Sequence, residues 1–282
     1  MRMVDTAPDL VQRAAAQLEN SSSRPQPITA RPRPVTVSPA KLAAHGIVLP
    51  DTVYSRTVEE FRAVKRGVLK AAARERGSVY AEQNRIVLVT SANPGEGKTF
   101  TAINLALSLA CEKDISPLLM DCDAYRQSLL EYLGISADRG WIDIVSGNDV
   151  LPGDVILSTS VPNLEILPAG KVCPHIPELM SSRSAGRLFS ELLLQNPNRI
   201  IVIDSLPCLT STEPSILAAL AGQTVFVVAA FATSSDDVAS SLRQVETCPS
   251  VSLVLNRAEK FLSDQGPANM SGADTSEAAH SR

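Results

Sequence analysis

The sequence predicts an α/β fold, in which a mostly parallel sheet is flanked by helices to give three layers. Two observations lead to this prediction. Between residues 85 and 257, short continuous apolar runs alternate with segments of helical periodicity, which is typical of parallel strands buried on both faces. The chain has 282 residues, of which 44% are hydrophobic, enough for a substantial core. A ligand of such a sheet should bind at the carboxyl ends of its strands.

The expected elements follow from these runs in chain order. Strands are predicted at residues 86–91, 118–121, 163–167, 200–204, 224–229 and 251–256. Helices are predicted at residues 99–112, 182–195, 213–221 and 235–246, where apolar residues recur at helical spacing. Strands that alternate with helices in this way favour a doubly wound sheet with right-handed crossovers.

Composition divides the chain into four segments. Residues 1–50 contain seven of the 19 prolines, so we expect a disordered tail there, with a short amphipathic helix at 9–18. Residues 51–84 contain a helix that starts near Ser55 and has helical apolar spacing. Residues 85–258 form the α/β domain, and the polar residues 259–282 are expected to be a disordered tail.

Charge, hydropathy and cysteine spacing exclude several classes of protein. The formal net charge is −4, from 26 basic and 30 acidic residues, so we expect no nucleic-acid partner. The longest apolar run, residues 225–232, falls far short of the roughly 18–20 residues of a membrane helix. Five scattered cysteines without CxxC spacing are typical of reduced thiols. We therefore expect a cytoplasmic protein.

A glycine-rich segment directly follows the first predicted strand of the domain. Residues 92–99 read ANPGEGKT, the P-loop (Walker A) pattern with alanine in place of its first glycine. Its glycines let backbone N–H groups surround a phosphate, its lysine is a cation for the β- and γ-phosphates, and the threonine hydroxyl suits Mg²⁺. The segment predicts a P-loop NTPase fold with a triphosphate site formed by Pro94, Gly95, Glu96, Gly97, Lys98, Thr99 and Phe100.

Two predicted strands end in aspartates. Asp121 ends one strand and is followed two residues later by Asp123, while Asp204 ends another strand. A carboxylate at the end of a parallel strand points into the ligand crevice and can bind Mg²⁺ directly or through water. We expect Asp204 to be the Walker B acid, and Asp121 with Asp123 to form a second acidic group. The alternative for each is a helix cap or a loop hydrogen bond.

The segments IVLVTSANPGEGKTFTAINLALSLA, LLMDCDAYR and IVIDSLP together resemble the bacterial tyrosine kinases of exopolysaccharide loci, P-loop proteins related to the MinD/ParA ATPases. The resemblance is greatest to the exosortase-associated (PEP-CTERM locus) tyrosine autokinase group and spans residues 41–258. It implies an ATP-dependent protein-tyrosine kinase that regulates exopolysaccharide synthesis and export, with ATP and Mg²⁺ as cofactors.

The resemblance also implies roles for individual residues. Lys98, Asp121 and Asp123 would be catalytic, and either aspartate would help to deprotonate a tyrosine hydroxyl. Thr99, Asp121 and Asp204 would surround Mg²⁺. A further site residue lies at the end of the last predicted strand, where Asn256 matches the asparagine that meets adenine in related ATPases; the alternative is a simple strand-to-turn residue.

The resemblance implies partners as well. These are a membrane polysaccharide copolymerase that activates the kinase and places it at the inner membrane face, and protein tyrosine substrates. The family's ExxRxxR helix assembles subunits into rings, and it is matched here by Glu59, Arg62 and Lys65. Lysine in the last position weakens that match, because lysine cannot form the bidentate contacts of arginine.

The distribution of tyrosine departs from the family pattern. The tyrosines are Tyr54, Tyr80, Tyr125 and Tyr132, so the tyrosine-rich C-terminal cluster that the family phosphorylates is missing from this sequence. The substrate is then another protein, or Tyr54 or Tyr80 is used, or kinase activity is lost and a nucleotide-switched regulator of the export machinery remains. A positioning ATPase like MinD ranks last, because its signature lysine is replaced by Asn93.

Overall fold

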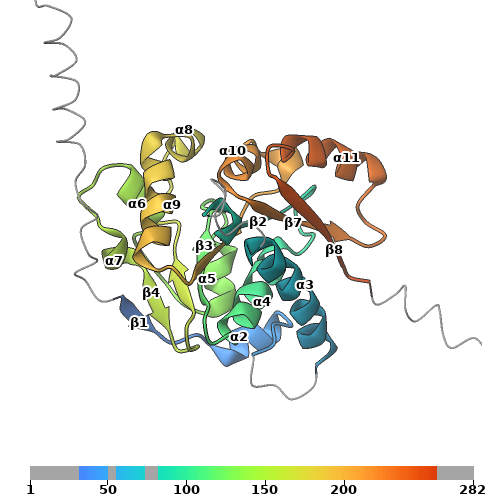
Figure 1. Cartoon of the computed structure of the whole chain (residues 1–282), viewed down its shortest axis with the longest axis horizontal. Coiled ribbons are helices and arrows are strands. Elements are labelled where there is room, and N and C mark those ends of the chain that lie inside the picture. Colours follow the sequence, from blue (N-terminus) through green and yellow to red (C-terminus); the bar gives the residue numbers. More distant parts are fainter. Residues whose placement is uncertain (1–31, 50–54, 74–81, 259–282) are drawn as a thin grey trace, which may run out of the picture.

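One eight-stranded sheet organises the computed structural model, which describes residues 32–49, 55–73 and 82–258 (Figure 1). The strand order is β1-β4-β5-β3-β6-β2-β7-β8, and every neighbouring pair is parallel except β4 with β5. The strands are β1 (Arg33–Val35), β2 (Ile86–Ser91), β3 (Ser116–Asp121), β4 (Leu157–Thr159), β5 (Glu165–Leu167), β6 (Arg199–Asp204), β7 (Gln223–Ala229) and β8 (Ser250–Asn256).

Helices cover both faces of the sheet, and this confirms the predicted three-layer architecture. Alternate residues of β2 belong to different cores: Val87 and Val89 pack with α3 and α4, whereas Ile86 and Leu88 pack on the other face. The helices are α2 (Pro39–Ala44), α3 (Arg56–Ala73), α4 (Lys98–Ala110), α5 (Ser128–Leu133), α6 (Trp141–Val145), α7 (Pro152–Val155), α8 (Ile176–Met180), α9 (Arg183–Gln195), α10 (Glu213–Leu220) and α11 (Ser235–Gln244).

The prediction of a disordered segment over residues 1–50 is wrong for residues 33–49. This stretch forms β1 and α2, and Leu42 is buried in the core beneath α4. Its prolines stand where no backbone N–H is needed, since Pro34 lies in an edge strand and Pro39 at the start of α2. Ser38 caps α2 by accepting a hydrogen bond from the Lys41 N–H. The predicted helix at 9–18 and the tail at 259–282 lie outside the described residues.

Strand β8 differs from the predicted pattern of burial on both faces. It lies at the edge of the sheet and pairs only with β7 among the described strands. Val251, Leu253 and Leu255 are exposed on one face of β8, while Val254 on the other face packs against the core. The other five predicted strands and the four predicted helices form within a few residues of their expected bounds. None of the described helices is long and apolar enough to cross a membrane.

Candidate nucleotide-binding and catalytic site

The phosphate loop joins β2 to α4, as the P-loop pattern predicts. Gly95 and Gly97 both adopt positive φ, +79° and +102°, a conformation that other residues rarely take. A Cβ on Gly97 would lie 2.1 Å from the amide nitrogen of Asn256, so only glycine fits at this position. Lys98 is the first residue of α4, which places its ammonium and the positive end of the helix dipole at the same point.

The end of β8 holds the outer side of this loop. Asn256 Nδ2 donates to the Glu96 carbonyl at 2.8 Å, and Arg257 Nη2 donates to the Gly95 carbonyl at 2.6 Å. Because these carbonyls are bonded to the end of β8, N–H groups of the loop are left to bind a phosphate. The sequence placed Asn256 at the site, but nothing in its pattern pointed to Arg257.

Two aspartates face the loop from adjacent strands. Asp121 of β3 and Asp204 of β6 are direct partners in the strand register, and both are fully buried. Asp121 Oδ1 accepts a hydrogen bond from the Asp123 N–H at 3.0 Å. The remaining oxygens, Oδ2 of Asp121 and both carboxylate oxygens of Asp204, have no hydrogen-bond partner. Buried acceptors of this kind are costly without a partner, so they mark a place for a cation.

Burial dominates the electrostatics of these groups. It raises the pKa of Asp204 to about 7, against the opposing effects of the Thr99 hydroxyl and the Lys98 ammonium. Burial, followed by the charge of Asp204, also raises the pKa of Asp121 well above its ordinary value. Burial lowers the pKa of Lys98, although Asp204, Asp123 and Glu96 favour its charged form. Burial therefore disfavours the ionised form of both aspartates, and a bound cation would favour it.

These residues fit a phosphate-bound Mg²⁺. The described residues contain no group of three or more His, Cys, Asp and Glu side chains that could hold a metal by themselves. Mg²⁺ in triphosphate sites takes one or two carboxylates and completes its shell with phosphate oxygens and water. The orphaned oxygens of Asp121 and Asp204, with the Thr99 hydroxyl at the start of α4, provide such a set.

Asp123 and its neighbours lie beside the two orphaned aspartates. The Asp123 side chain is 5% exposed, and its pKa is raised by burial against the opposing effects of Arg126 and Lys98. Trp141 Nε1 donates to the Asp121 carbonyl at 2.9 Å and so fixes the end of β3. Sequence reasoning missed this contact, because it joins a side chain to a distant backbone atom and leaves no pattern in the sequence.

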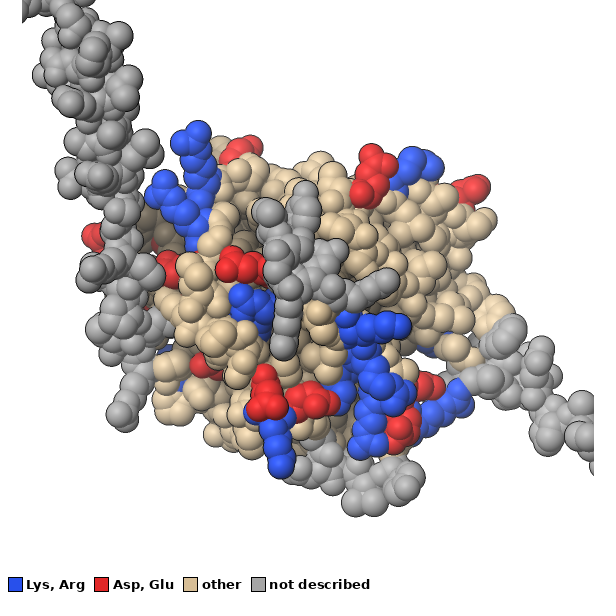
Figure 2. Space-filling view, viewed as in Figure 1, with Lys and Arg blue, Asp and Glu red and all other residues tan. Residues whose placement is uncertain are grey.

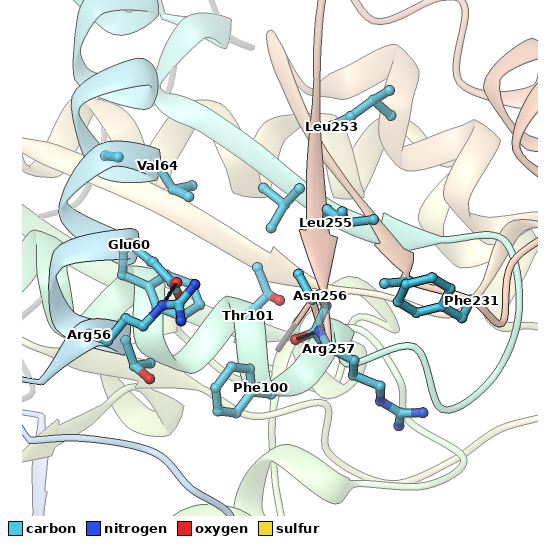
Figure 3. A pocket seen from close by; sticks show the side chains of 16 residues that line it. Arg56, Glu60, Val64, Phe100, Thr101, Phe231, Leu253, Leu255, Asn256 and Arg257 are labelled. Atoms are coloured by element: carbon cyan, nitrogen blue, oxygen red, sulfur yellow. Dashed lines mark hydrogen bonds and ion pairs between the residues drawn. The ribbon is translucent and has the colours of Figure 1, made fainter. Parts of the chain in front are cut away.

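A groove of about 950 Å³ leads away from the phosphate loop between α3, the start of α4 and β8. Figure 3 shows Phe100, Thr101, Asn256 and Arg257 near the loop, with Arg56 and Glu60 on the wall formed by α3. Phe61 packs edge-on against Phe100 with 5.8 Å between ring centroids. Apolar side chains and the Asn256 amide line the groove, a composition that suits a nucleoside.

Known proteins of similar sequence and structure identify the family of this chain. No family model matches the chain. Tyrosine-protein kinase CpsD of Streptococcus agalactiae is 28% identical over 215 residues, which cover 75% of this chain and 88% of that protein. The crystal structure of the VpsO kinase domain has 31% sequence identity and a TM-score of 0.55, and the match covers 68% of this chain and 97% of that one. The chain belongs to the bacterial tyrosine kinase family.

Other relatives agree with this assignment. Tyrosine-protein kinase wzc of Salmonella typhimurium is 30% identical over 166 residues, which cover 58% of this chain and 22% of that protein. The fold is shared with the kinase domain of Escherichia coli tyrosine kinase ETK, with a TM-score of 0.63 at 19% identity. It is also shared with a chain of the MinC:MinD cell division protein complex of Aquifex aeolicus, with a TM-score of 0.52 at 19% identity.

The helix matched to the family's assembly motif is α3. Lys and Arg side chains gather over α3 among acidic ones (Figure 2). Glu59 and Arg62 are exposed and form an ion pair with each other. Lys65 is buried instead, and its Nζ lies 2.6 Å from Glu112 Oε1 of the same chain. In this bacterial tyrosine kinase, Lys65 therefore packs within the subunit and does not share the exposed surface of Glu59 and Arg62.

Two of the kinase's four tyrosines fall within the described residues. Tyr125 is 55% exposed and lies two residues after Asp123. Tyr132 stacks on His45 with 3.7 Å between ring centroids, so it links α5 to the segment after α2. Tyr54 and Tyr80, which one of the three alternatives names as acceptors, lie outside the described residues.

Proposed function

We propose that the chain is an ATP-dependent protein-tyrosine kinase that regulates exopolysaccharide synthesis and export. One observation carries the proposal: Asp121 and Asp204 meet in register opposite the Lys98 phosphate loop and leave three buried carboxylate oxygens without partners. Such an arrangement is suited to a phosphate-bound cation at the ends of parallel strands. Membership of the bacterial tyrosine kinase family supports transfer of the phosphoryl group to tyrosine.

Each site residue has a role in this proposal. Residues 94–99 hold the triphosphate through backbone N–H groups, and Lys98 neutralises charge on the β- and γ-phosphates. Thr99, Asp121 and Asp204 would hold Mg²⁺, which when bound stabilises negative charge on the transferred group. Asp123 accepts the proton of the tyrosine hydroxyl. Its raised pKa makes it a better proton acceptor than an ordinary aspartate.

The groove beyond the phosphate loop would hold the nucleoside. Phe100 provides an apolar contact for adenine, and Asn256 provides the amide that meets its edge. Asn256 donates one N–H to the Glu96 carbonyl, and its Oδ1 accepts the Arg257 N–H at 2.9 Å, so its second N–H and the second lone pair of Oδ1 remain for the base. This arrangement connects base recognition directly to the position of the phosphate loop.

The partners follow from the family resemblance. A membrane polysaccharide copolymerase would activate the kinase and hold it at the inner face of the membrane, and exposed Glu59 and Arg62 would contribute to contacts between subunits. Lys65 would join such a contact only by leaving Glu112. A second function, a nucleotide-switched regulator without kinase activity, is favoured by the lack of any tyrosine after Tyr132 in this sequence.

A phosphotyrosine map separates these two functions. The purified full chain, alone and with its co-expressed membrane partner, is incubated with ATP and Mg²⁺ and analysed by mass spectrometry. The kinase proposal predicts phosphate on tyrosine of this chain or of the partner, and its loss in Lys98→Met. ATP hydrolysis without phosphotyrosine on either protein would favour the regulator and contradict the kinase proposal.

A further inference from the structure

The phosphate loop is tied to a loop more than 130 residues away in the sequence. Residues 230–237, which connect β7 to α11 and form the first turn of that helix, contact the loop through two side chains. We propose that Thr233 and Asp237 are positioning residues that hold the phosphate loop in its binding conformation. This inference rests on the proposed nucleotide site and names residues that neither the P-loop pattern nor the strand-end acids include.

The first tie runs from Thr233 to Glu96. The Thr233 hydroxyl donates to Glu96 Oε1, while the other oxygen, Oε2, accepts the Asn93 N–H at 2.9 Å. Thr233 Oγ1 in turn accepts the Ala229 N–H at 3.0 Å, so the hydroxyl is anchored to the end of β7. The Glu96 side chain is 4% exposed and both of its oxygens are occupied. This carboxylate therefore braces the loop from within and is not available to a nucleotide.

The second tie runs from Asp237 to Asn93. Asn93 Nδ2 donates to Asp237 Oδ2 at 3.0 Å. The Asp237 N–H donates to Ser234 Oγ at 3.1 Å, which caps the start of α11 and fixes the first turn that carries the carboxylate. These two hydrogen bonds thus hold the loop at Asn93 and Glu96, on either side of the Pro94–Gly95 turn.

The position of these hydrogen bonds explains how they would affect nucleotide binding. A phosphate is bound by loop N–H groups that must all point inward together. The two glycines give the loop freedom to leave that arrangement, and the side-chain ties remove that freedom before the nucleotide arrives. Losing the Thr233 hydroxyl also leaves Glu96 Oε1 buried without a donor, which favours a relaxed loop. Preorganisation of this kind acts on affinity.

The test measures the Kd of the full chain for an ATP analogue with Mg²⁺ by calorimetry. Thr233→Val should weaken binding by about tenfold, the size expected for one lost bond to a buried charged group, whereas Thr233→Ser keeps the hydroxyl and should bind within about twofold of wild type. Thr159→Val is the matched control, because the Thr159 hydroxyl likewise donates to carbonyl oxygens and accepts a backbone N–H, but lies in β4. Thermal unfolding without nucleotide checks that all variants are folded.

A double-mutant cycle tests the mechanism. If Thr233 acts through Glu96, then Thr233→Val should change Kd by less than about twofold in a Glu96→Ala background. Asp237→Ala should also weaken binding, and Asp237→Asn, which keeps an acceptor oxygen, should restore it. If the wild type fails to bind the ATP analogue, the proposed function fails and this inference with it. If the wild type binds and Thr233→Val binds equally well, the positioning role alone is overturned.

Discussion

Asp121 and Asp204 face each other in register at the carboxyl ends of β3 and β6, and three of their four carboxylate oxygens have no hydrogen-bond partner. The two acids are fully buried, and burial is the largest cause of the raised pKa of each. Two adjacent carboxylates repel each other when both are ionised. The ionised forms of Asp121 and Asp204 therefore lower the stability of the nucleotide-free protein, at the point where the chemistry is proposed to occur.

Asp204→Asn should stabilise the nucleotide-free protein at alkaline pH. The pKa of Asp204 is about 7 in the folded state, above the ordinary aspartate value of about 4, so the folded state binds more protons than the unfolded state between these values. The free energy of unfolding contributed by this group therefore falls as pH rises from about 4 to about 7. The amide avoids that loss, so we expect a gain of roughly 2 to 4 kcal/mol at pH 8 and little difference at pH 4.

Urea unfolding at the two pH values measures this gain. Asp138→Asn, which replaces an exposed acid, is the control and should change stability little at either pH. Mg²⁺ with ATP should raise the unfolding temperature of the wild type but should have a smaller effect on Asp204→Asn. An equal or lower stability of Asp204→Asn at pH 8 would show that the carboxylate is not strained.

Gly97→Ala should abolish nucleotide binding. The added Cβ would lie 2.1 Å from Asn256 Nδ2, and the φ of +102° is strained for alanine. The phosphate loop would move away from Asn256 and lose the hydrogen bond to the Glu96 carbonyl. Equilibrium binding of a fluorescent ATP analogue should show a loss of at least about 100-fold, equivalent to roughly 3 kcal/mol.

Gly67→Ala serves as the control for this substitution. Gly67 lies inside α3, and its added Cβ would meet no atom within 4 Å. Alanine is the better helix former by roughly 0.5 to 1 kcal/mol, so this variant should bind normally and unfold at a slightly higher temperature. Normal binding by Gly97→Ala would contradict the described approach of Asn256 to the loop.

Leu42→Ala should destabilise the whole domain. Leu42 is 1% exposed and packs in the same core as α3 and α4, so its loss should cost about 2 to 5 kcal/mol. Lys41→Ala, at the exposed neighbouring position of α2, is the matched control. Urea unfolding distinguishes the two. Equal stability of the two variants would mean that residues 33–49 do not belong to the folded domain.

The sequence predicts most of the sheet because buried parallel strands are continuous apolar runs, and the phosphate loop because its glycines and lysine have a fixed spacing. It misses β1 and β4, whose three residues each include only one large apolar side chain, too few to form an apolar run. The prolines at 34 and 39 misled the prediction, since an edge strand and a helix start both tolerate proline. The prediction that β8 is buried on both faces was wrong, because apolar content does not reveal which strand lies at the edge of a sheet.

The candidate site, like the fold, could be predicted only in part from the sequence. Lys98, Thr99, Asp121 and Asp204 meet as the spacing of their motifs predicts, since the carboxyl ends of parallel strands share one edge. Contacts between distant segments could not be predicted. Thr233 reaches Glu96 across 137 residues, and this contact depends on how a loop closes after folding. The Glu96 side chain takes the role of an internal brace, while the backbone N–H of Glu96 stays a predicted contact of the nucleotide.

The most direct test of the proposed kinase function is whether phosphate from the γ position of ATP arrives on tyrosine. The wild-type chain and Lys98→Met are incubated separately with γ-labelled ATP and Mg²⁺, together with the co-expressed membrane partner, and label on tyrosine is measured after digestion. The kinase function predicts labelled phosphotyrosine with the wild type and none with Lys98→Met. Unlabelled tyrosine in a wild-type protein that binds and hydrolyses ATP would contradict it.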